Sequence, residues 1–124
     1  MREQEPIVFI VDDDDSVRRG LARLLRSAGY RVETFVSARD YLAHGDRDAA
    51  GCLVLDVRMP GQSGPELHDL LVEAGHDIPV VFITGHGDMP MAVRALKSGA
   101  DFLLKPVDSV TLLTAVQQAI REAR

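Results

Sequence analysis

Three aspartates, a threonine and a lysine stand at the ends of short apolar runs in the sequence. The first run is followed by Asp12 and Asp13, the third ends in Asp56, the fourth ends in Thr84, and the fifth is followed by Lys105. If these runs are neighbouring parallel strands, the five side chains meet at one edge of a sheet, where the ligands of such sheets bind. Crowded carboxylates repel one another, and burial disfavours their charged forms further.

The chemistry open to this set is phosphoryl transfer to a carboxylate. Magnesium binds one or two carboxylates together with water and phosphate oxygens. Asp12, Asp13 and Asp56 offer the carboxylates, and the turn after Asp56 offers a backbone carbonyl. A carboxylate can attack phosphorus to form an acyl phosphate. The cation, the Lys105 ammonium and the Thr84 hydroxyl would then neutralise the oxygens of the transferred group.

Each of these residues also has an ordinary structural explanation. Acidic runs such as residues 12–15 usually provide solvated helix N-caps, and we expect Asp14 or Asp15 to do only that. Strand-terminal Asp and Thr residues are often caps as well. The coincidence of the whole set at successive strand ends favours the functional interpretation.

Strands and helices alternate along the chain to position these side chains. Continuous apolar runs are typical of parallel strands covered on both faces, and they occupy residues 7–11, 32–35, 52–55, 80–83 and 102–104. The weaker second run and the short fifth run are expected at the sheet edges. An apolar stripe over residues 17–28 predicts the first helix. Capping residues mark the starts of the next three, namely Ser37, Ser63 and Asp88, and a fifth helix is expected from near Asp108.

Five such units joined by right-handed crossovers predict an α/β fold, a doubly wound parallel sheet in one domain over residues 1–124. The net charge of −5 and the pI of about 5.2 argue against direct binding to nucleic acid or to an anionic membrane. The sequence has neither a signal core nor an apolar run of about 20 residues, and Cys52 is its single cysteine. A cytoplasmic protein is expected.

Four motifs together resemble those of two-component response regulator receiver domains across essentially the whole chain. They are IVDD, LDVRMPGQSG, PVVFITG and LLKP. The stretch TGHGDMPMAVRALKSGA is particularly similar to the FixJ and DctD types of transcriptional regulator. The resemblance implies a flavodoxin-like receiver fold with five helices and a five-stranded sheet of order 2-1-3-4-5.

The resemblance also implies a role for each matching acidic residue. Asp56 would be the phosphoacceptor. Asp13 would bind magnesium, or manganese, directly, whereas Asp12 would bind it through water. Asp56 itself and the backbone carbonyl of Arg58 would be further metal ligands.

Thr84 and Lys105 would contact the phosphoryl oxygens, and Thr84 and Phe102 would form the conformational switch. The Lys105–Pro106 peptide bond is often cis in the family, whereas the general frequency for bonds before proline is only about 5–6%. One departure from the FixJ pattern stands out. The stretch from Thr84 to Lys105 is one residue shorter, around residues 99–101, which could alter the Phe102 switch.

Two further side chains are expected to flank the site. Arg58 lies two residues after Asp56, and His86 lies two residues after Thr84. We hypothesise that this pair controls the access of water to the acyl phosphate and so sets its lifetime. Two solvated side chains without such a role are the alternative. His68 and His76 are expected to be exposed on or after the third helix.

The partners follow from the same resemblance. A sensor histidine kinase would donate the phosphoryl group, and the receiver would not be an enzyme beyond its own phosphorylation and dephosphorylation. Phosphorylation would change the face built from the fourth helix, the fifth strand and the fifth helix. That change would control homodimerisation or a C-terminal DNA-binding effector domain, which this chain does not contain.

Three other functions compete with this one. An aspartyl-phosphate phosphohydrolase would need a D-x-D pair on the first strand and a substrate cap, whereas this chain has adjacent aspartates. A flavodoxin-like electron carrier would need a phosphate-binding loop where residues 12–15 are all acidic. An interaction module that works without phosphorylation would not need the complete acidic set, Thr84 and Lys105.

Overall fold

The computed structural model of the protein describes residues 5–45, 49–59, 61–85 and 101–122. The strands are β1 (Ile7–Val11), β2 (Arg31–Phe35), β3 (Gly51–Asp56), β4 (Val80–Thr84) and β5 (Asp101–Leu104). The helices are α1 (Asp15–Ser27), α2 (Ala38–His44), α3 (Gly64–Glu73) and α5 (Ser109–Glu122). The expected fourth helix, which begins at Asp88, lies outside the described residues, as does His86. No described helix has the length and apolar character needed to span a bilayer.

The sheet is parallel throughout and has the order β2-β1-β3-β4-β5. This is the expected order, with the second and fifth strands at the edges. The central strands β1 and β3 are buried at every position, which explains the continuous apolar runs at residues 7–11 and 52–55.

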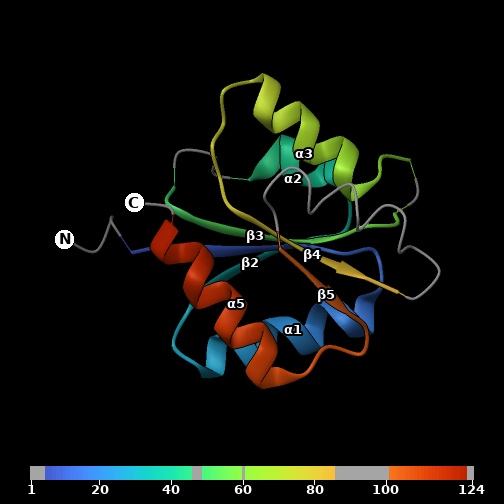
Figure 1. Cartoon of the computed structure of the whole chain (residues 1–124). Coiled ribbons are helices and arrows are strands. Elements are labelled where there is room, and N and C mark those ends of the chain that lie inside the picture. The colour runs from blue at the N-terminus through green and yellow to red at the C-terminus, as the bar shows by residue number, and fades with distance from the viewer. Residues whose placement is uncertain (1–4, 46–48, 60, 86–100, 123–124) are drawn as a thin grey trace.

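Helices cover both faces of the sheet, with α2 and α3 on one side and α1 and α5 on the other (Figure 1). Alternate residues of β1 serve the two layers, because successive side chains of a strand point to opposite faces. Phe9 packs in the cluster under α2 and α3, whereas Val8 and Ile10 pack in the cluster under α1 and α5. The sheet is therefore stabilised by two hydrophobic clusters, one on each face.

Capping residues begin the described helices, and those of α1, α2 and α3 are the predicted ones. The Asp14 carboxylate accepts a hydrogen bond from the Val17 amide at 3.0 Å and starts α1. Ser37 starts α2 in the same way, and Ser63 forms a reciprocal capping box with Glu66 at the start of α3. Asp108 accepts from the Thr111 amide at 3.0 Å ahead of α5. Each helix after a strand therefore begins at a defined residue.

One expectation about the histidines is wrong. His68 is half-buried, and its ring packs edge-on against Phe82 with centroids 5.7 Å apart. His76 is also half-buried, and its Nε2 atom is buried without a hydrogen-bond partner in the described part of the chain. Both lie in or after α3 as expected, but this helix packs close enough to β4 to cover His68.

Candidate functional site: an acidic cluster at the carboxyl edge of the sheet

The strand register brings the predicted site residues to one edge of the sheet. Val11 of β1 pairs with Leu55 of β3, so Asp12 follows directly beside Asp56. Asp56 is level with Ile83, which places Thr84 one position further along β4. Lys105 follows β5, and its amide donates to the Thr84 carbonyl at 2.8 Å.

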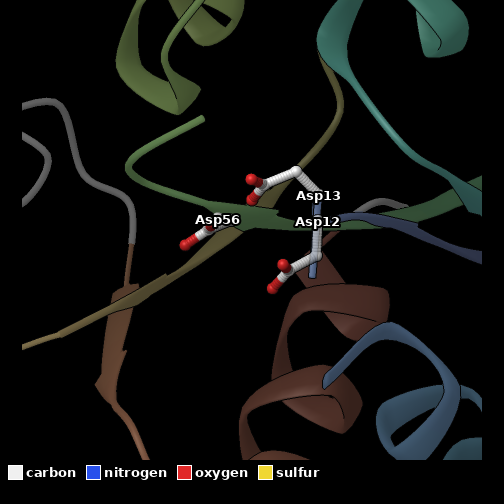
Figure 2. A group of neighbouring side chains, drawn as sticks. All are labelled: Asp12, Asp13 and Asp56. Atoms are coloured by element: carbon white, nitrogen blue, oxygen red, sulfur yellow. The ribbon is translucent and has the colours of Figure 1, made fainter. Parts of the chain in front are cut away.

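Asp12, Asp13 and Asp56 form a compact carboxylate cluster (Figure 2). Each offers one oxygen, and these oxygens all lie within 4.8 Å of one another. Asp12 is 1% exposed and Asp56 is 6% exposed, whereas Asp13 is open to solvent. The cluster therefore has a buried floor and an accessible side.

Local hydrogen bonds fix Asp12. Its amide donates to the Phe35 carbonyl at 3.2 Å, and its carbonyl accepts from the Arg18 guanidinium at 2.8 Å. Its Oδ1 atom accepts from the Asp14 amide at 2.9 Å. The Oδ2 atom is buried and has no hydrogen-bond partner among the described residues. An unsatisfied buried carboxylate oxygen is costly, and a cation can satisfy it.

Lys105 is the cation within this cluster. Its Nζ atom lies 3.2 Å from Asp56 Oδ1 and 3.6 Å from Asp12 Oδ2. The Lys105–Pro106 peptide bond is cis, as the family resemblance implied. Within the described part of the chain, this ammonium forms ion pairs with two of the three clustered carboxylates.

The pKa shifts follow from this arrangement. Burial, followed by repulsion from Asp12, raises the pKa of Asp56 to about 6, against the opposing effect of Lys105. Burial also raises the pKa of Asp12. For Lys105 burial alone would lower the pKa, but attraction to Asp12 and Asp56 outweighs it, so the pKa is raised and the ammonium persists. Ionisation of Asp12 and Asp56 therefore lowers the free energy of unfolding.

Magnesium fits these residues. The donors are hard carboxylate oxygens, and the accessible side leaves room for water and phosphate oxygens. The Asp12 Oδ2 atom, which has no hydrogen bond and lies 3.6 Å from Lys105 Nζ, belongs to the cluster. Asp12, Asp13 and Asp56 would hold the ion. The positive charge would relieve the repulsion that raises the pKa of Asp56.

The other predicted residues lie around this cluster. Thr84 is fully buried at the end of β4, and its hydroxyl donates to the Gly85 carbonyl at 3.1 Å. Phe102 is half-buried and packs against the cluster under α2 and α3. Phe102 pairs in register with Phe82.

The Arg58 side chain is exposed in the loop after β3. Of the short junction around residues 99–101, only Asp101 is described, as the first residue of β5.

Gly64 is a site residue that the sequence reasoning missed. Its amide donates to the Val57 carbonyl at 2.9 Å. A Cβ atom at this position would lie only 2.4 Å from the backbone oxygen of Asp56. Only glycine lets the start of α3 approach the strand end this closely. The available sequence signal was a glycine directly after the capping residue Ser63, and the sequence analysis used only Ser63.

The chain is similar to known response regulators over most of its length. Residues 8–117 match the family described as the response regulator receiver domain. Response regulator protein TmoT of Ectopseudomonas mendocina is 48% identical over 124 residues, which cover 99% of this chain and 56% of TmoT. Transcriptional regulatory protein FixJ of Azorhizobium caulinodans is 47% identical over 114 residues, which cover 91% of this chain and 54% of FixJ. The chain spans about half the length of these relatives.

A solved structure agrees with the sequence matches. The crystal structure of FixJ-N has a TM-score of 0.87 to this chain at 43% identity, and the match covers 95% of each chain. The predicted fold and the predicted similarity to FixJ are thus confirmed. The chain belongs to the response regulator receiver family.

Proposed function

We propose that the protein is a magnesium-dependent phosphoryl acceptor of a two-component system, phosphorylated on Asp56 by a sensor histidine kinase. The single observation that carries this proposal is the convergence of Asp12, Asp13 and Asp56 with the Lys105 ammonium 3.2 Å from Asp56. Family membership supports the signalling role. The proposal takes residues 1–124 as one receiver domain and the cytoplasm as its location.

The transfer forms one bond and breaks one. A carboxylate oxygen of Asp56 attacks the phosphorus of a phosphohistidine, the P–N bond breaks, and the leaving imidazole nitrogen keeps the electron pair and takes a proton from solvent. Magnesium, or manganese, supplies charge neutralisation at the carboxylates and the phosphoryl oxygens when it is bound, with the Arg58 carbonyl as a further ligand. Lys105 stays close enough to Asp56 to donate to a phosphoryl oxygen.

The switch begins at Thr84 in this proposal. Its hydroxyl, now bonded to the Gly85 carbonyl, would rotate to donate to a phosphoryl oxygen. Phe102 would then move further into the space beside β4, because its half-buried ring already packs against the hydrophobic cluster under α2 and α3. The outer face around β5 and α5 would change with it. This is population shift between two states rather than creation of a new one.

The output would pass through that face. We expect it to control homodimerisation through the fourth helix, β5 and α5, or an effector domain carried by a longer form of the protein. The relatives that are about twice as long support the second route. Hydrolysis of the acyl phosphate would end the signal, with Arg58 and His86 controlling the entry of water. The domain would act as a signalling protein rather than as an enzyme with multiple turnovers.

Acetyl phosphate with magnesium tests the proposal. Intact-mass measurement should show the gain of one phosphoryl group, which hydroxylamine removes because acyl phosphates are labile to it. Asp56→Asn should abolish the gain. Asp77→Asn, which changes an exposed aspartate in the loop after α3, is the matched control and should label like the wild type. Labelling retained by Asp56→Asn, or resistant to hydroxylamine, would contradict the proposal.

A phosphohydrolase is the less favoured alternative. Such an enzyme would release phosphate from an added phosphomonoester with many turnovers, whereas the proposed receiver consumes acetyl phosphate only as fast as its own acyl phosphate hydrolyses. The receiver family match favours the signalling function.

A further inference from the structure

A groove between α1 and the edge strand β2 is lined mainly by arginines. Its volume is about 360 Å³, and its lining consists of Arg18, Arg19, Ala22, Arg23, Arg26 and Thr34. None of the three clustered aspartates belongs to this lining. The groove is therefore separate from the phosphoacceptor site.

The arginines form two lines along α1. Arg18, Ala22 and Arg26 follow one another at intervals of four residues, and Arg19 and Arg23 form the adjacent line. Four residues of helix span about 6 Å, so the two ends of the groove are about 12 Å apart. Arg18 bonds to the Asp12 carbonyl and Arg26 to the Val32 carbonyl at 3.1 Å, which fixes the ends. The small side chain of Ala22 leaves the space between them open.

Positive charge is in excess in this groove. Asp15 pairs with Arg18 at 2.5 Å and with Arg19 at 2.7 Å. Within the described ranges, Arg23 makes no ion pair and no hydrogen bond. Glu33 on β2 does not compensate, because it shares its strand face with Phe35, which packs under α2. Four arginines against one aspartate make a local basic site on a chain with a net charge of −5.

The neighbouring backbone also suits an extended ligand. Strand β2 is the outermost of the described strands, and among them it pairs with β1 alone. Thr34 contributes its side chain to the groove from that strand. Alternate residues of an extended segment are about 6.6 Å apart, close to the spacing of about 6 Å along each arginine line.

We propose that this groove binds a short extended acidic segment of a partner protein, with Glu or Asp at alternate positions. The fit is to a segment of limited length, because Asp12–Asp15 lie beyond Arg18 and would repel a longer polyanion. For that reason, and because of the net charge of the chain, nucleic acid is the less suitable occupant. The proposal depends on neither magnesium nor Asp56.

An eight-residue peptide of alternating Glu and Ser, blocked at both ends, is the probe. Its fluorescence anisotropy should titrate to saturation with the protein at low salt and weaken as salt is added. The double variant Arg23→Gln with Arg26→Gln should bind about tenfold more weakly, because each lost pair with a carboxylate is worth a few-fold in affinity. Arg18 is left unchanged because it holds the Asp12 backbone.

The matched control is Arg39→Gln with Arg121→Gln. It changes the net charge equally, at exposed positions on α2 and α5, and Arg121 lies in the last turn of its helix as Arg26 does. The control should bind the peptide within about twofold of the wild type, and circular dichroism should show both double variants folded. Equal weakening by both double variants, binding that does not saturate, or tighter binding of a duplex oligonucleotide of equal charge would each overturn the proposal.

Discussion

Removing the charge of Asp56 is expected to stabilise the metal-free protein. The folded protein raises the pKa of this carboxyl from 3.8 to about 6, mainly through burial. The folded state thus binds the proton more tightly than the unfolded chain does. Ionisation therefore costs stability, and the cost grows from about pH 4 to about pH 6 and is constant above that range. Asp56→Asn is nearly isosteric and has no charge at any of these pH values.

The expected magnitude follows from the same shift. Two pKa units correspond to about 3 kcal/mol at pH 7.5, and the same linkage gives only about 1 kcal/mol at pH 4.5. Because the asparagine also leaves Lys105 with one partner fewer, we expect a net gain of about 1–3 kcal/mol in the free energy of unfolding at pH 7.5.

Urea unfolding with a chelator present measures this difference. The wild type, Asp56→Asn and the control Asp77→Asn are compared at pH 7.5 and pH 4.5. The gain of Asp56→Asn should be larger at pH 7.5, and the control should stay within about 0.5 kcal/mol of the wild type. An Asp56→Asn protein that is no more stable than the wild type at pH 7.5, or whose gain does not change with pH, would show that burial and carboxylate repulsion do not strain this site.

Three other perturbations have defined outcomes. Saturating magnesium should raise the melting temperature of the wild type by mass action, and Asp13→Asn should reduce this rise; an unchanged rise would exclude Asp13 as a ligand. Gly64→Ala should lower the free energy of unfolding by about 1–3 kcal/mol and slow phosphorylation by acetyl phosphate, because its Cβ would press on the Asp56 carbonyl; normal stability and rate would contradict the close approach. Ser63→Ala should cost about 1 kcal/mol in urea unfolding through loss of the α3 cap, and a neutral result would refute the contribution of the capping box.

Much of this fold was predictable because local patterns agree with the global arrangement. The apolar runs marked the strands, since β1 and β3 are buried on both faces. The side chains of Ser37 and Ser63 marked helix starts within one residue. The acidic cluster was predictable for a different reason: parallel strands put their carboxyl ends at one edge, and the strand order implied by the family resemblance puts Asp12 beside Asp56.

What was missed depends on tertiary distances. His68 was expected to be exposed because helix periodicity says which residues share a face, but not how closely α3 packs on Phe82. Gly64 was quoted only within the motif LDVRMPGQSG because its role depends on a backbone oxygen eight residues earlier, which the sequence does not show. The arginine groove escaped notice because α1 was searched for its apolar stripe, and the groove also needs Thr34 from β2.

The backbone after β3 is held from two sides. The Val57 amide donates to Ile83 of β4, and the Val57 carbonyl accepts from Gly64 of α3. If Asp56 is phosphorylated as proposed, the peptide groups next to it would thus have little freedom to adjust to the larger side chain. The Thr84 hydroxyl, by contrast, is bonded only to the carbonyl of the adjacent Gly85 among the described residues. Lys105 approaches Asp56 from the loop after β5. In the proposed phosphorylated state we therefore expect the side chains of Thr84 and Lys105, rather than the backbone after β3, to change position.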